Sequence, residues 1–518
     1  MKKLLLNIFA TGLALASITT AQAQRYLTPV FPSASKTANV VYGNNYQVLT
    51  GTPVAVDLKM DVYQPSGASD PITERPLVIV LHTGSFLPPV VNGQPTGTKG
   101  DSTIVQACTD FARRGYVAAA VDYRLGWNPA ATGAAGQDIR TGTLLNAVYR
   151  AILDAKACVR YFRKDVATNG NSFGIDTNKI ILGGFGTGGY IALAYATLNN
   201  PAEMSLTKFL ANTTNASYGF VAGQSYVNQA VLGDFEGYGG IAGYNNPNNS
   251  VGYTSNVQFV FNAGGAMGDS SWVEPGDAPM VNFHVVGDPF APYGIGPVVV
   301  PTTGDFVVEV SGSQSVATLA NADGNNNCMI SAGFTDNLTT YAMANTGNLE
   351  GLYPFYTTPA QQAGPWEWYD STVTVLTAQA LGYPASAGTS AYTNSLLTNP
   401  DMSKAKAVAY IDTIMGYLNP RVVYCLGLTT GLNTVSNLTA NVNIQPNPSA
   451  DRTVITADKL AGDIRTIRVY DIIGNEVYSQ EGINADRFTL ERNGLQSGLY
   501  IVKMSFDKGE ATGKVVFN

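Results

Sequence analysis

Residues 180–190 constrain the fold more than any other stretch, because an apolar run there ends in a cluster of glycines and leads directly into a second apolar segment. The sequence is I-I-L-G-G-F-G-T-G-G-Y, followed by I-A-L-A-Y-A-T-L. The first run is typical of a buried strand, the glycines permit a tight turn, and the later apolar residues have helical spacing. The stretch therefore predicts a strand, a sharp turn and a helix in direct succession.

Two kinds of site use such a turn. The pattern G-x-S-x-G holds a serine nucleophile on a strained turn above a sheet, and Gly186 stands here in the serine position. The pattern G-x-G-x-x-G lets backbone N–H groups approach a dinucleotide pyrophosphate, and Gly184, Gly186 and Gly189 match it. Dinucleotide binding also needs an acidic residue about 20 positions later at the end of the next strand. Glu203 does not end a strand-like run, so we favour the first interpretation.

Strand-like and helix-like segments alternate around this turn. Residues 40–64 have the alternating pattern of one or two antiparallel strands. The runs L-V-I-V-L-H, Y-V-A-A-A-V and V-Q-F-V-F-N are typical of strands buried on both faces. Residues 104–114 and 144–163 have apolar side chains at helical spacing. This alternation predicts an α/β fold with a mostly parallel sheet flanked by helices.

Five sequence blocks strengthen this prediction: L-K-M-D-V-Y-Q-P, L-V-I-V-L-H-T-G-S-F, F-A-R-R-G-Y-V-A-A-A-V-D-Y-R-L-G, D-A-K-A-C-V-R-Y-F-R and G-I-D-T-N-K-I-I-L-G-G-F-G-T-G-G. In order and spacing they resemble the α/β-hydrolase superfamily, specifically secreted carboxylesterases and feruloyl-esterase-like enzymes. The resemblance covers residues 54–196 and resumes at 257–293. It implies an α/β-hydrolase domain over residues 24–426, with cap-forming insertions at about 197–256 and 294–400.

A hydrolase of this class needs a nucleophile, an acid and a base in the chain order Ser, Asp or Glu, His. The resemblance places Asp288, in H-V-V-G-D-P-F-A-P-Y, at the acid position and Gly186 at a vacant nucleophile position. The base should follow Asp288, but the chain has only two histidines, His82 and His284. The resemblance gives both of them structural roles. Two of three catalytic side chains are therefore expected to be missing.

The backbone donors of an oxyanion hole need no particular side chain. The resemblance places the N–H of Thr187 and one N–H from Gly84, Ser85 or Phe86 at the amino end of the helix, where the helix dipole favours a negative oxygen. We therefore predict Gly84, Ser85 and Thr187 as ligand-binding residues for an ester, carboxylate or glycan-like molecule, with no cofactor. The leading hypothesis is a non-catalytic pseudoenzyme. One alternative is an active ester hydrolase with Thr187 or Ser85 as an unorthodox nucleophile, and another is a structural or adhesive surface protein.

Two smaller candidates remain open. The run N-A-D-G-N-N-N offers oxygen ligands for calcium, but it lacks the closing glutamate of a calcium loop, so we favour a solvated turn. Trp366, Trp368 and Tyr369 either stack on a ligand at the mouth of the site or form the buried core of an insertion.

Residues 441–518 differ from the rest of the chain. They contain short alternating strands with a turn signal every 8–12 residues or so, the pattern of a small β-sandwich. The order P-N-P, Y-D-I-I-G, S-G-L-Y-I-V and a terminal K-V-V closely resembles the C-terminal sorting domain of the type IX secretion system. A carbohydrate-binding sandwich is the alternative. Residues 427–440 are the expected linker.

The amino terminus also indicates export. Residues 1–23 have two lysines, an apolar run and A-Q-A, the pattern of a signal peptide. No later stretch reaches the ~18 apolar residues of a transmembrane helix. Without Lys2 and Lys3 the chain has 28 basic and 37 acidic residues, a net charge of −9, which argues against nucleic acid as a partner. We expect a protein that is secreted or anchored at the outer-membrane surface by the type IX machinery.

An exported chain can form disulfides, and this one has four cysteines. Cys158 lies in a helical run, where it is expected to be a small core residue. One bridge among Cys108, Cys328 and Cys425 is plausible, with the pairing left open. No Cys-x-x-Cys or His-x-x-x-His spacing indicates a zinc site.

Overall fold

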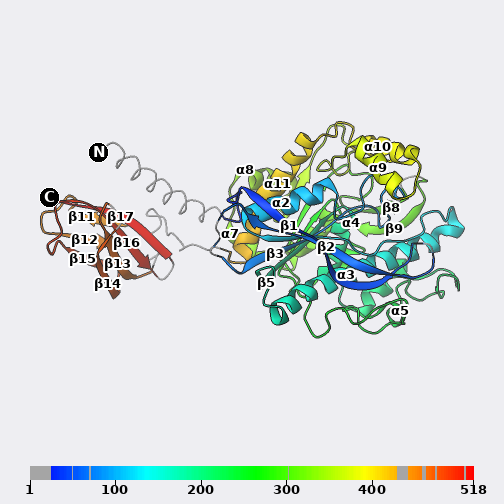
Figure 1. The fold of residues 1–518 in the computed structure, drawn as a ribbon, viewed down its shortest axis with the longest axis horizontal. Coiled ribbons are helices and arrows are strands. Elements are labelled where there is room, and N and C mark those ends of the chain that lie inside the picture. The colour runs from blue at the N-terminus through cyan, green and yellow to red at the C-terminus, as the bar shows by residue number, and fades with distance from the viewer. Residues whose placement is uncertain are drawn as a thin grey trace. The chain divides into compact units, whose positions relative to one another are not determined.

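The computed structural model describes residues 25–49, 51–68, 70, 72–300, 303–428, 442–457, 462–472, 475–506 and 509–518. These residues fall into two compact units, one within 24–428 and one within 429–518 (Figure 1). The predicted signal peptide and nearly all of the predicted linker lie outside the described residues. Across the parts of the chain that are described, no helix combines the length and the apolar character needed to span a membrane.

The larger unit is built on one eight-stranded sheet with the order β1-β2-β4-β3-β5-β6-β7-β10. Its strands are β1 (Ser33–Gln47), β2 (Val54–Ser66), β3 (Arg75–Leu81), β4 (Val117–Val121), β5 (Ile175–Phe185), β6 (Phe259–Ala263), β7 (Met280–Val285) and β10 (Leu352–Phe355). β1 and β2 are antiparallel to their neighbours, and the strands from β4 to β10 run parallel. The predicted α/β fold is confirmed.

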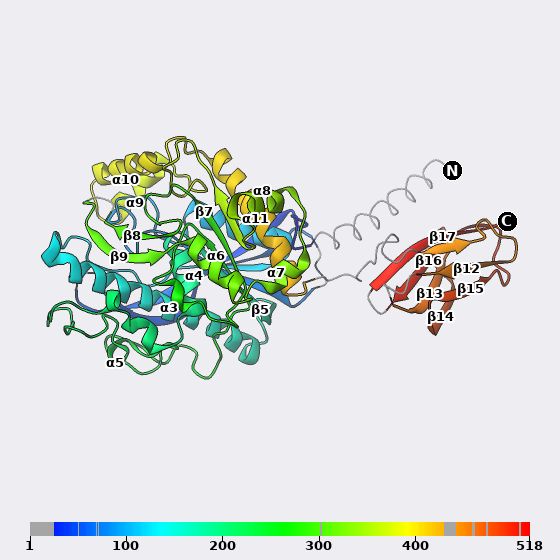
Figure 2. The same ribbon diagram turned by 180° about the vertical axis from the view of Figure 1, so that it is seen from behind.

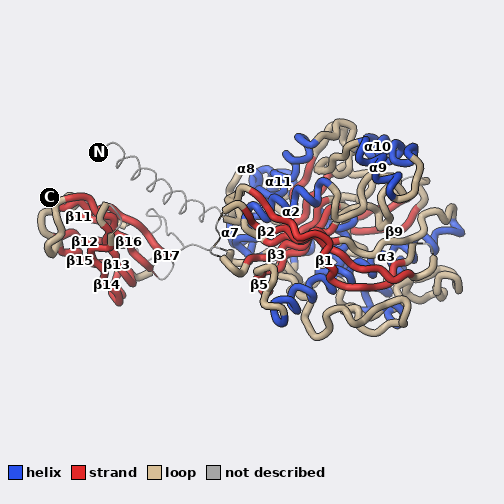
Figure 3. The backbone as a smooth tube through the Cα atoms, in the orientation of Figure 1, coloured by secondary structure: helices blue, strands red, loops and turns tan. Residues whose placement is uncertain are grey.

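Helices cover both faces of this sheet (Figures 1 and 3). α3 (Gln137–Thr168) and α4 (Thr187–Thr197) share one core with Leu77, Ile79 and Leu81 of β3. α2 (Ser102–Arg114) and α11 (Lys404–Cys425) share the other core with Val78 and Val80. Because successive side chains of a strand point to opposite faces, the continuous apolar run of β3 supplies both cores.

The segment 197–256 lies outside the sheet and contains mostly loops, with the short helices η2 (Pro201–Ser205), η3 (Thr207–Phe209) and α5 (Gln229–Leu232). The carboxylate of Asp138 on α3 holds this segment, because it accepts hydrogen bonds from Asn212, Thr213 and Tyr226. Burial opposes ionisation of Asp138, but these bonds outweigh it and hold its pKa at about 2.

The segment 294–400 contains more regular structure than the sequence predicts (Figure 2). Its elements are the hairpin β8 (Ile295–Val299) and β9 (Phe306–Ser311), the helices α6 (Ser313–Ala322), α7 (Asn327–Ala332) and α8 (Asn337–Thr346), the strand β10, and the helices α9 (Ser371–Ala380) and α10 (Ala385–Thr398). β10 pairs in parallel with β7. Part of the segment predicted as an insertion therefore belongs to the main sheet.

A disulfide joins Cys328 on α7 to Cys425 at the end of α11, while Cys108 and Cys158 are free and buried. One bridge forms among the three expected cysteines. The candidate calcium run lies just before Cys328, where the side chains of Asn325 and Asn326 form hydrogen bonds with the backbone of residues 274, 276, 280 and 350. These asparagines are buried and serve packing. The described residues contain no group of three or more side chains suited to a metal ion.

The smaller unit is all β, in agreement with the predicted sandwich. One sheet has the order β11-β12-β15 and the other β14-β13-β16-β17. The strands are β11 (Asn443–Gln445), β12 (Arg452–Thr456), β13 (Ile464–Tyr470), β14 (Glu476–Ala485), β15 (Arg487–Glu491), β16 (Gly498–Phe506) and β17 (Gly509–Phe517). Side chains from both sheets, such as Ile455 and Val502, share one buried core.

Candidate functional site

The predicted turn is present between β5 and α4. Gly186 has φ 52° and ψ −118°, and its N–H donates to the carbonyl of Ala263 on β6 at 2.8 Å. This positive φ is disfavoured for residues with a Cβ atom. The strand ends, the chain reverses at one residue, and the helix begins at Thr187, so residues 180–190 fold as predicted.

The other glycines of this stretch have a packing role. A Cβ on Gly184 would lie 2.4 Å from the backbone of Gly188, and one on Gly188 would lie 2.2 Å from the carbonyl oxygen of Leu81 on β3. A Cβ on Gly189 would lie 2.0 Å from the side chain of Asn262 on β6. Glycine therefore lets α4 approach the sheet closely. This requirement accounts for the G-x-G-x-x-G pattern without a dinucleotide.

The side chain of Thr83 occupies the space above Gly186. A Cβ on Gly186 would lie 2.1 Å from Thr83 Oγ1 and 2.7 Å from Thr83 Cβ. The position from which a nucleophile side chain would project is thus filled by a neighbouring threonine. Sequence reasoning missed Thr83, although it directly follows His82 in the loop that was expected to border the turn.

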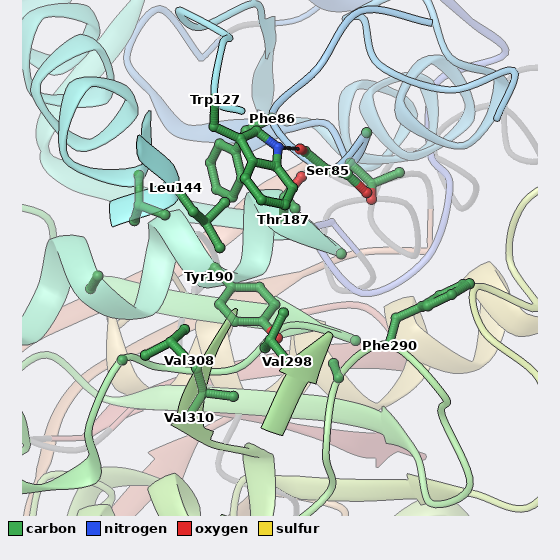
Figure 4. A pocket seen from close by; sticks show the side chains of 18 of the residues that line it. Ser85, Phe86, Trp127, Leu144, Thr187, Tyr190, Phe290, Val298, Val308 and Val310 are labelled. Atoms are coloured by element: carbon green, nitrogen blue, oxygen red, sulfur yellow. Dashed lines mark hydrogen bonds between the residues drawn. The ribbon is translucent and has the colours of Figure 1, made fainter. Parts of the chain in front are cut away.

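The loop after β3 has a strained backbone. Gly84, Ser85 and Phe86 have φ values of 124°, 53° and 55°, and two successive non-glycine residues with positive φ are uncommon. Hydrogen bonds from neighbouring segments hold the loop. Trp127 Nε1 donates to the carbonyl oxygen of Ser85 at 2.7 Å (Figure 4). The N–H of Gly126 donates to the carbonyl oxygen of Phe86, also at 2.7 Å. The loop is fixed beside the amino end of α4.

The three predicted ligand-binding residues, Gly84, Ser85 and Thr187, line the same cavity as Gly186. The N–H of Thr187 lies in the first turn of α4, where N–H groups have no acceptor within the helix. The Thr187 hydroxyl faces Tyr123, whose own hydroxyl donates to the carbonyl of His82 at 2.8 Å. Thr187 must therefore donate its proton to Tyr123, at 3.2 Å. The hydroxyl proton of Thr187 is therefore engaged in a hydrogen bond to the phenol oxygen of Tyr123.

Neither histidine of the chain lines the cavity. His284 on β7 is buried, which lowers its pKa to about 4 and keeps it neutral. Its Nε2 donates to the carbonyl of Ala291 at 3.0 Å, so its Nδ1 accepts from Ser313 at 2.7 Å. His82 is also buried and stacks on Tyr123 with ring centroids 4.3 Å apart. Both histidines shape the loops around the cavity.

Asp288, the predicted acid, lies in the loop after β7 and lines the cavity. Its Oδ1 accepts from the N–H groups of Phe290 at 2.7 Å and Ala291 at 3.1 Å. Burial raises the pKa of Asp288 to about 7, although these two bonds act against the rise. Asp288 therefore lines the same cavity as Gly186 and Thr187.

A second carboxyl at the site, Glu367, was not predicted. It lies in the loop after β10, lines the cavity and accepts a hydrogen bond from the Tyr369 hydroxyl at 2.7 Å. Burial, with a further contribution from the charges of Asp101 and Asp288, raises the pKa of Glu367 to about 8, although the bond from Tyr369 acts against the rise. The adjacent Trp366 is 1% exposed and also lines the cavity, so it belongs both to the core and to the site.

The cavity has a volume of about 230 Å³ and two chemically distinct ends. The polar end contains Thr83, Ser85, Thr187, Asp288 and Glu367. The other end is an apolar channel between α3, α4, segment 197–256 and the β8–β9 hairpin; Figure 4 shows part of its wall. The channel is lined by Leu144, Leu145, Val148, Ile152, Ala194, Leu198, Met204, Phe209, Val227, Trp272, Val298, Val308 and Val310. No lysine, arginine or histidine is among the described residues that line the cavity.

Comparison with protein families gives two matches. Residues 60–293 match the family model described as BD-FAE. Residues 443–518 match the model of the secretion system C-terminal sorting domain. No curated protein matches the chain in sequence.

Solved structures of Thermogutta terrifontis esterase 2 are similar to this chain. The propionate-bound form is 16% identical, with 71% of this chain and 93% of that chain covered and a TM-score of 0.33. The native form is 16% identical, with 71% and 91% covered and a TM-score of 0.33. The form phosphorylated by paraoxon is 18% identical, with 63% and 83% covered and a TM-score of 0.32. This likeness is too weak to transfer a function.

Proposed function

An esterase-like α/β-hydrolase domain and a type IX sorting domain share this chain, and we propose that it binds a ligand in the hydrolase cavity without hydrolysing it. The sorting domain makes the protein one that is secreted or anchored at the cell surface. Binding would then take place outside the cell.

The occupied space above the turn carries this proposal. Thr83 Oγ1 would lie 2.1 Å from a Cβ on Gly186, so the turn cannot present a side chain to a substrate in this arrangement. Neither histidine of the chain lines the cavity, so no histidine there can act as the catalytic base. Both observations support the loss of nucleophile and base, while the cavity itself remains open.

The cavity indicates the class of ligand. Backbone N–H groups at the amino end of α4 suit a carbonyl oxygen, and the channel suits an apolar chain. Engineered apolar protein cavities of about 150 Å³ bind benzene, which has six carbon atoms. The volume of about 230 Å³ in this protein therefore suits a chain of roughly six to ten carbon atoms. The lack of lysine and arginine disfavours a carboxylate ligand, and the apolar lining disfavours an unsubstituted glycan. We therefore propose an ester or another neutral carbonyl compound with an apolar chain.

The purified protein is expected not to hydrolyse p-nitrophenyl esters with acyl chains of two to ten carbons above the buffer rate. It is also expected to remain unlabelled by a fluorophosphonate probe, because no base activates the hydroxyls of Thr83, Ser85 or Thr187. Mass spectrometry of the treated protein locates any label. Turnover together with a label on one of these three hydroxyls would establish the active-hydrolase alternative instead.

Val298→Trp on β8 is expected to weaken the binding of methyl octanoate about tenfold, because the larger side chain fills the channel and excludes roughly two methylene groups at about 0.8 kcal/mol each. Titration calorimetry measures the affinity, and a ligand-dependent rise in melting temperature reports binding independently. Val373→Trp is the matched control, because Val373 is 59% exposed on α9 and is not among the cavity-lining residues. Absence of binding to the unmodified protein would favour the structural or adhesive alternative.

A further inference from the structure

The polar end of the cavity contains hydrogen-bonding groups of both kinds that the protein leaves without partners. Two are acceptors on half-buried carboxyls, Asp288 Oδ2 and Glu367 Oε1. Two carry a proton, the phenol of Tyr190 and the indole N–H of Trp366, and all four residues line the cavity. Buried polar groups in proteins are normally hydrogen-bonded, so this set of unpaired groups indicates a ligand that pairs with donors and acceptors alike.

The most deeply buried of these groups is the indole N–H of Trp366. The side chain is 1% exposed, yet its Nε1 has no hydrogen-bond partner among the described residues. The indole edge that carries Nε1 also carries Cζ2, because both atoms are bonded to Cε2. This edge faces the cavity wall, since a Cβ on Gly264 would lie 2.9 Å from Cζ2 and 4.0 Å from Asp288 Oδ2. The indole N–H only donates, so its partner has to be an acceptor.

Each of the two carboxyls is fixed through one oxygen and leaves the other free. Asp288 Oδ1 accepts from the N–H groups of Phe290 and Ala291, and no described residue donates to Oδ2. Glu367 Oε2 accepts from the Tyr369 hydroxyl, and no described residue donates to Oε1. An ionised carboxyl only accepts hydrogen bonds, whereas a protonated one can also donate. A hydroxyl group pairs with a carboxyl in either form.

The fourth group is the phenol of Tyr190 on α4. Its side chain extends toward Val298 and Val308 of the β8–β9 hairpin (Figure 4), and no described residue forms a hydrogen bond with its hydroxyl. Burial raises the pKa of Tyr190, with a contribution from the nearby charge of Asp288, so the phenol is neutral. It can donate or accept a hydrogen bond.

This set of groups selects against a charged ligand. The described lining residues include no lysine, arginine or histidine, so an anion would meet only like charge. An ammonium group would satisfy the carboxyls, but it offers no acceptor to the indole N–H. The described residues also provide no set of three metal ligands. A hydroxyl donates one hydrogen bond and accepts up to two, so it matches both the carboxyls and the indole.

We infer that these four side chains form a subsite for hydroxyl groups on the alcohol part of an ester whose acyl chain lies in the channel. This inference rests on the proposed binding function of the cavity. The hydroxyls donate to the free carboxyl oxygens, and one of them accepts from the indole N–H. Because Asp288 and Glu367 lie on different loops, two hydroxyls on neighbouring carbons reach both of them. The ligand class is accordingly a medium-chain monoester of a small polyol, of which glycerol is the simplest.

Propyl hexanoate and 1-hexanoylglycerol test this subsite, because they differ only in two hydroxyl groups. The glycerol ester is expected to bind at least about tenfold more tightly, since the propyl ester would leave the polar groups of the site buried and unpaired. Titration calorimetry measures both affinities. A propyl ester that binds as tightly as the glycerol ester, or more tightly, overturns the inference.

Single substitutions locate the contacts. Tyr190→Phe, Trp366→Phe and Glu367→Met each remove one hydrogen-bonding group and are expected to weaken the binding of 1-hexanoylglycerol about three- to tenfold. Propyl hexanoate should bind within about twofold of its affinity for the unmodified protein, which also verifies that each variant is folded. Tyr383→Phe is the matched control, because it removes an exposed phenol hydroxyl outside the cavity. If Trp366→Phe does not fold, an unchanged preference in Tyr190→Phe and Glu367→Met still overturns the inference.

The same measurements separate this subsite from the binding function of the cavity. If the two hexanoate esters bind equally well, only the subsite fails. If neither they nor methyl octanoate bind, the binding function fails and the subsite fails with it. If the esters are hydrolysed while the glycerol ester is still preferred, only the non-catalytic function fails.

Discussion

Gly186→Ser is expected to destabilise the hydrolase unit by about 2–6 kcal/mol. A side chain at a sparsely populated backbone conformation costs about 1–3 kcal/mol, and forcing it into occupied space costs about another 1–3 kcal/mol. Both terms apply, because Gly186 has φ 52° and its new Cβ would lie 2.1 Å from Thr83 Oγ1. All four tryptophans of the chain lie between residues 127 and 368, so urea unfolding followed by tryptophan fluorescence reports on this unit alone.

The double variant Thr83→Gly/Gly186→Ser separates the two costs. Removing the Thr83 side chain is expected to restore about 1–3 kcal/mol of the lost stability, since only the clash is relieved. Gly219→Ser is the control for backbone strain alone, because Gly219 has φ 73° and nothing within 4 Å of an added Cβ. A Gly186→Ser protein as stable as Gly219→Ser would show that Thr83 does not fill the space above the turn.

The same double variant also tests the missing base. It presents a serine on the turn without the obstructing threonine, yet no histidine lines the cavity to activate it. Ester hydrolysis is therefore expected to stay near the buffer rate. Efficient turnover by this variant would mean that another group serves as base, and Glu367 would be the first residue to test.

Much of the fold follows from local patterns. The turn at Gly186 was predictable, because an apolar strand, clustered glycines and a helical repeat are all visible in one short stretch. β10 was missed because its four residues, L-Y-P-F, are too few to show a period and lie inside a long polar segment. Its pairing with β7 is a long-range contact that no local pattern specifies.

The site was predictable only where a motif marks it. Asp288 follows a strand in a recognisable block, and Gly84, Ser85 and Thr187 flank predicted strand ends. Thr83 and Gly186 are more than one hundred positions apart in the sequence. Only the structure shows that the Thr83 side chain fills the space above Gly186. Glu367 reaches the cavity because β10 delivers the following loop to the end of the sheet, so a missed strand led to a missed carboxyl.

Asp288 and Glu367 are expected to make the hydrolase unit less stable as pH rises from about 5 to about 8. Their pKa values in the folded protein, about 7 and about 8, exceed the ordinary carboxyl values of about 4, so in this range the folded state holds protons that the unfolded state has released. Stability falls with pH wherever the folded state binds more protons, by up to about 1.4 kcal/mol per pH unit for each carboxyl. Below about pH 4 both states are protonated, and the two groups contribute no slope.

Asp288→Asn/Glu367→Gln should flatten this decline, because neither new side chain titrates. Burial also raises the pKa of Asp277, to about 6, but this residue is the same in both proteins. The difference in stability between the unmodified protein and the double variant therefore reports on Asp288 and Glu367 alone. Urea unfolding at several pH values gives the two curves. Glu309→Gln, which changes an exposed carboxyl on β9, is the control and should follow the unmodified protein. Parallel curves would mean that these two carboxyls keep ordinary pKa values in the folded protein.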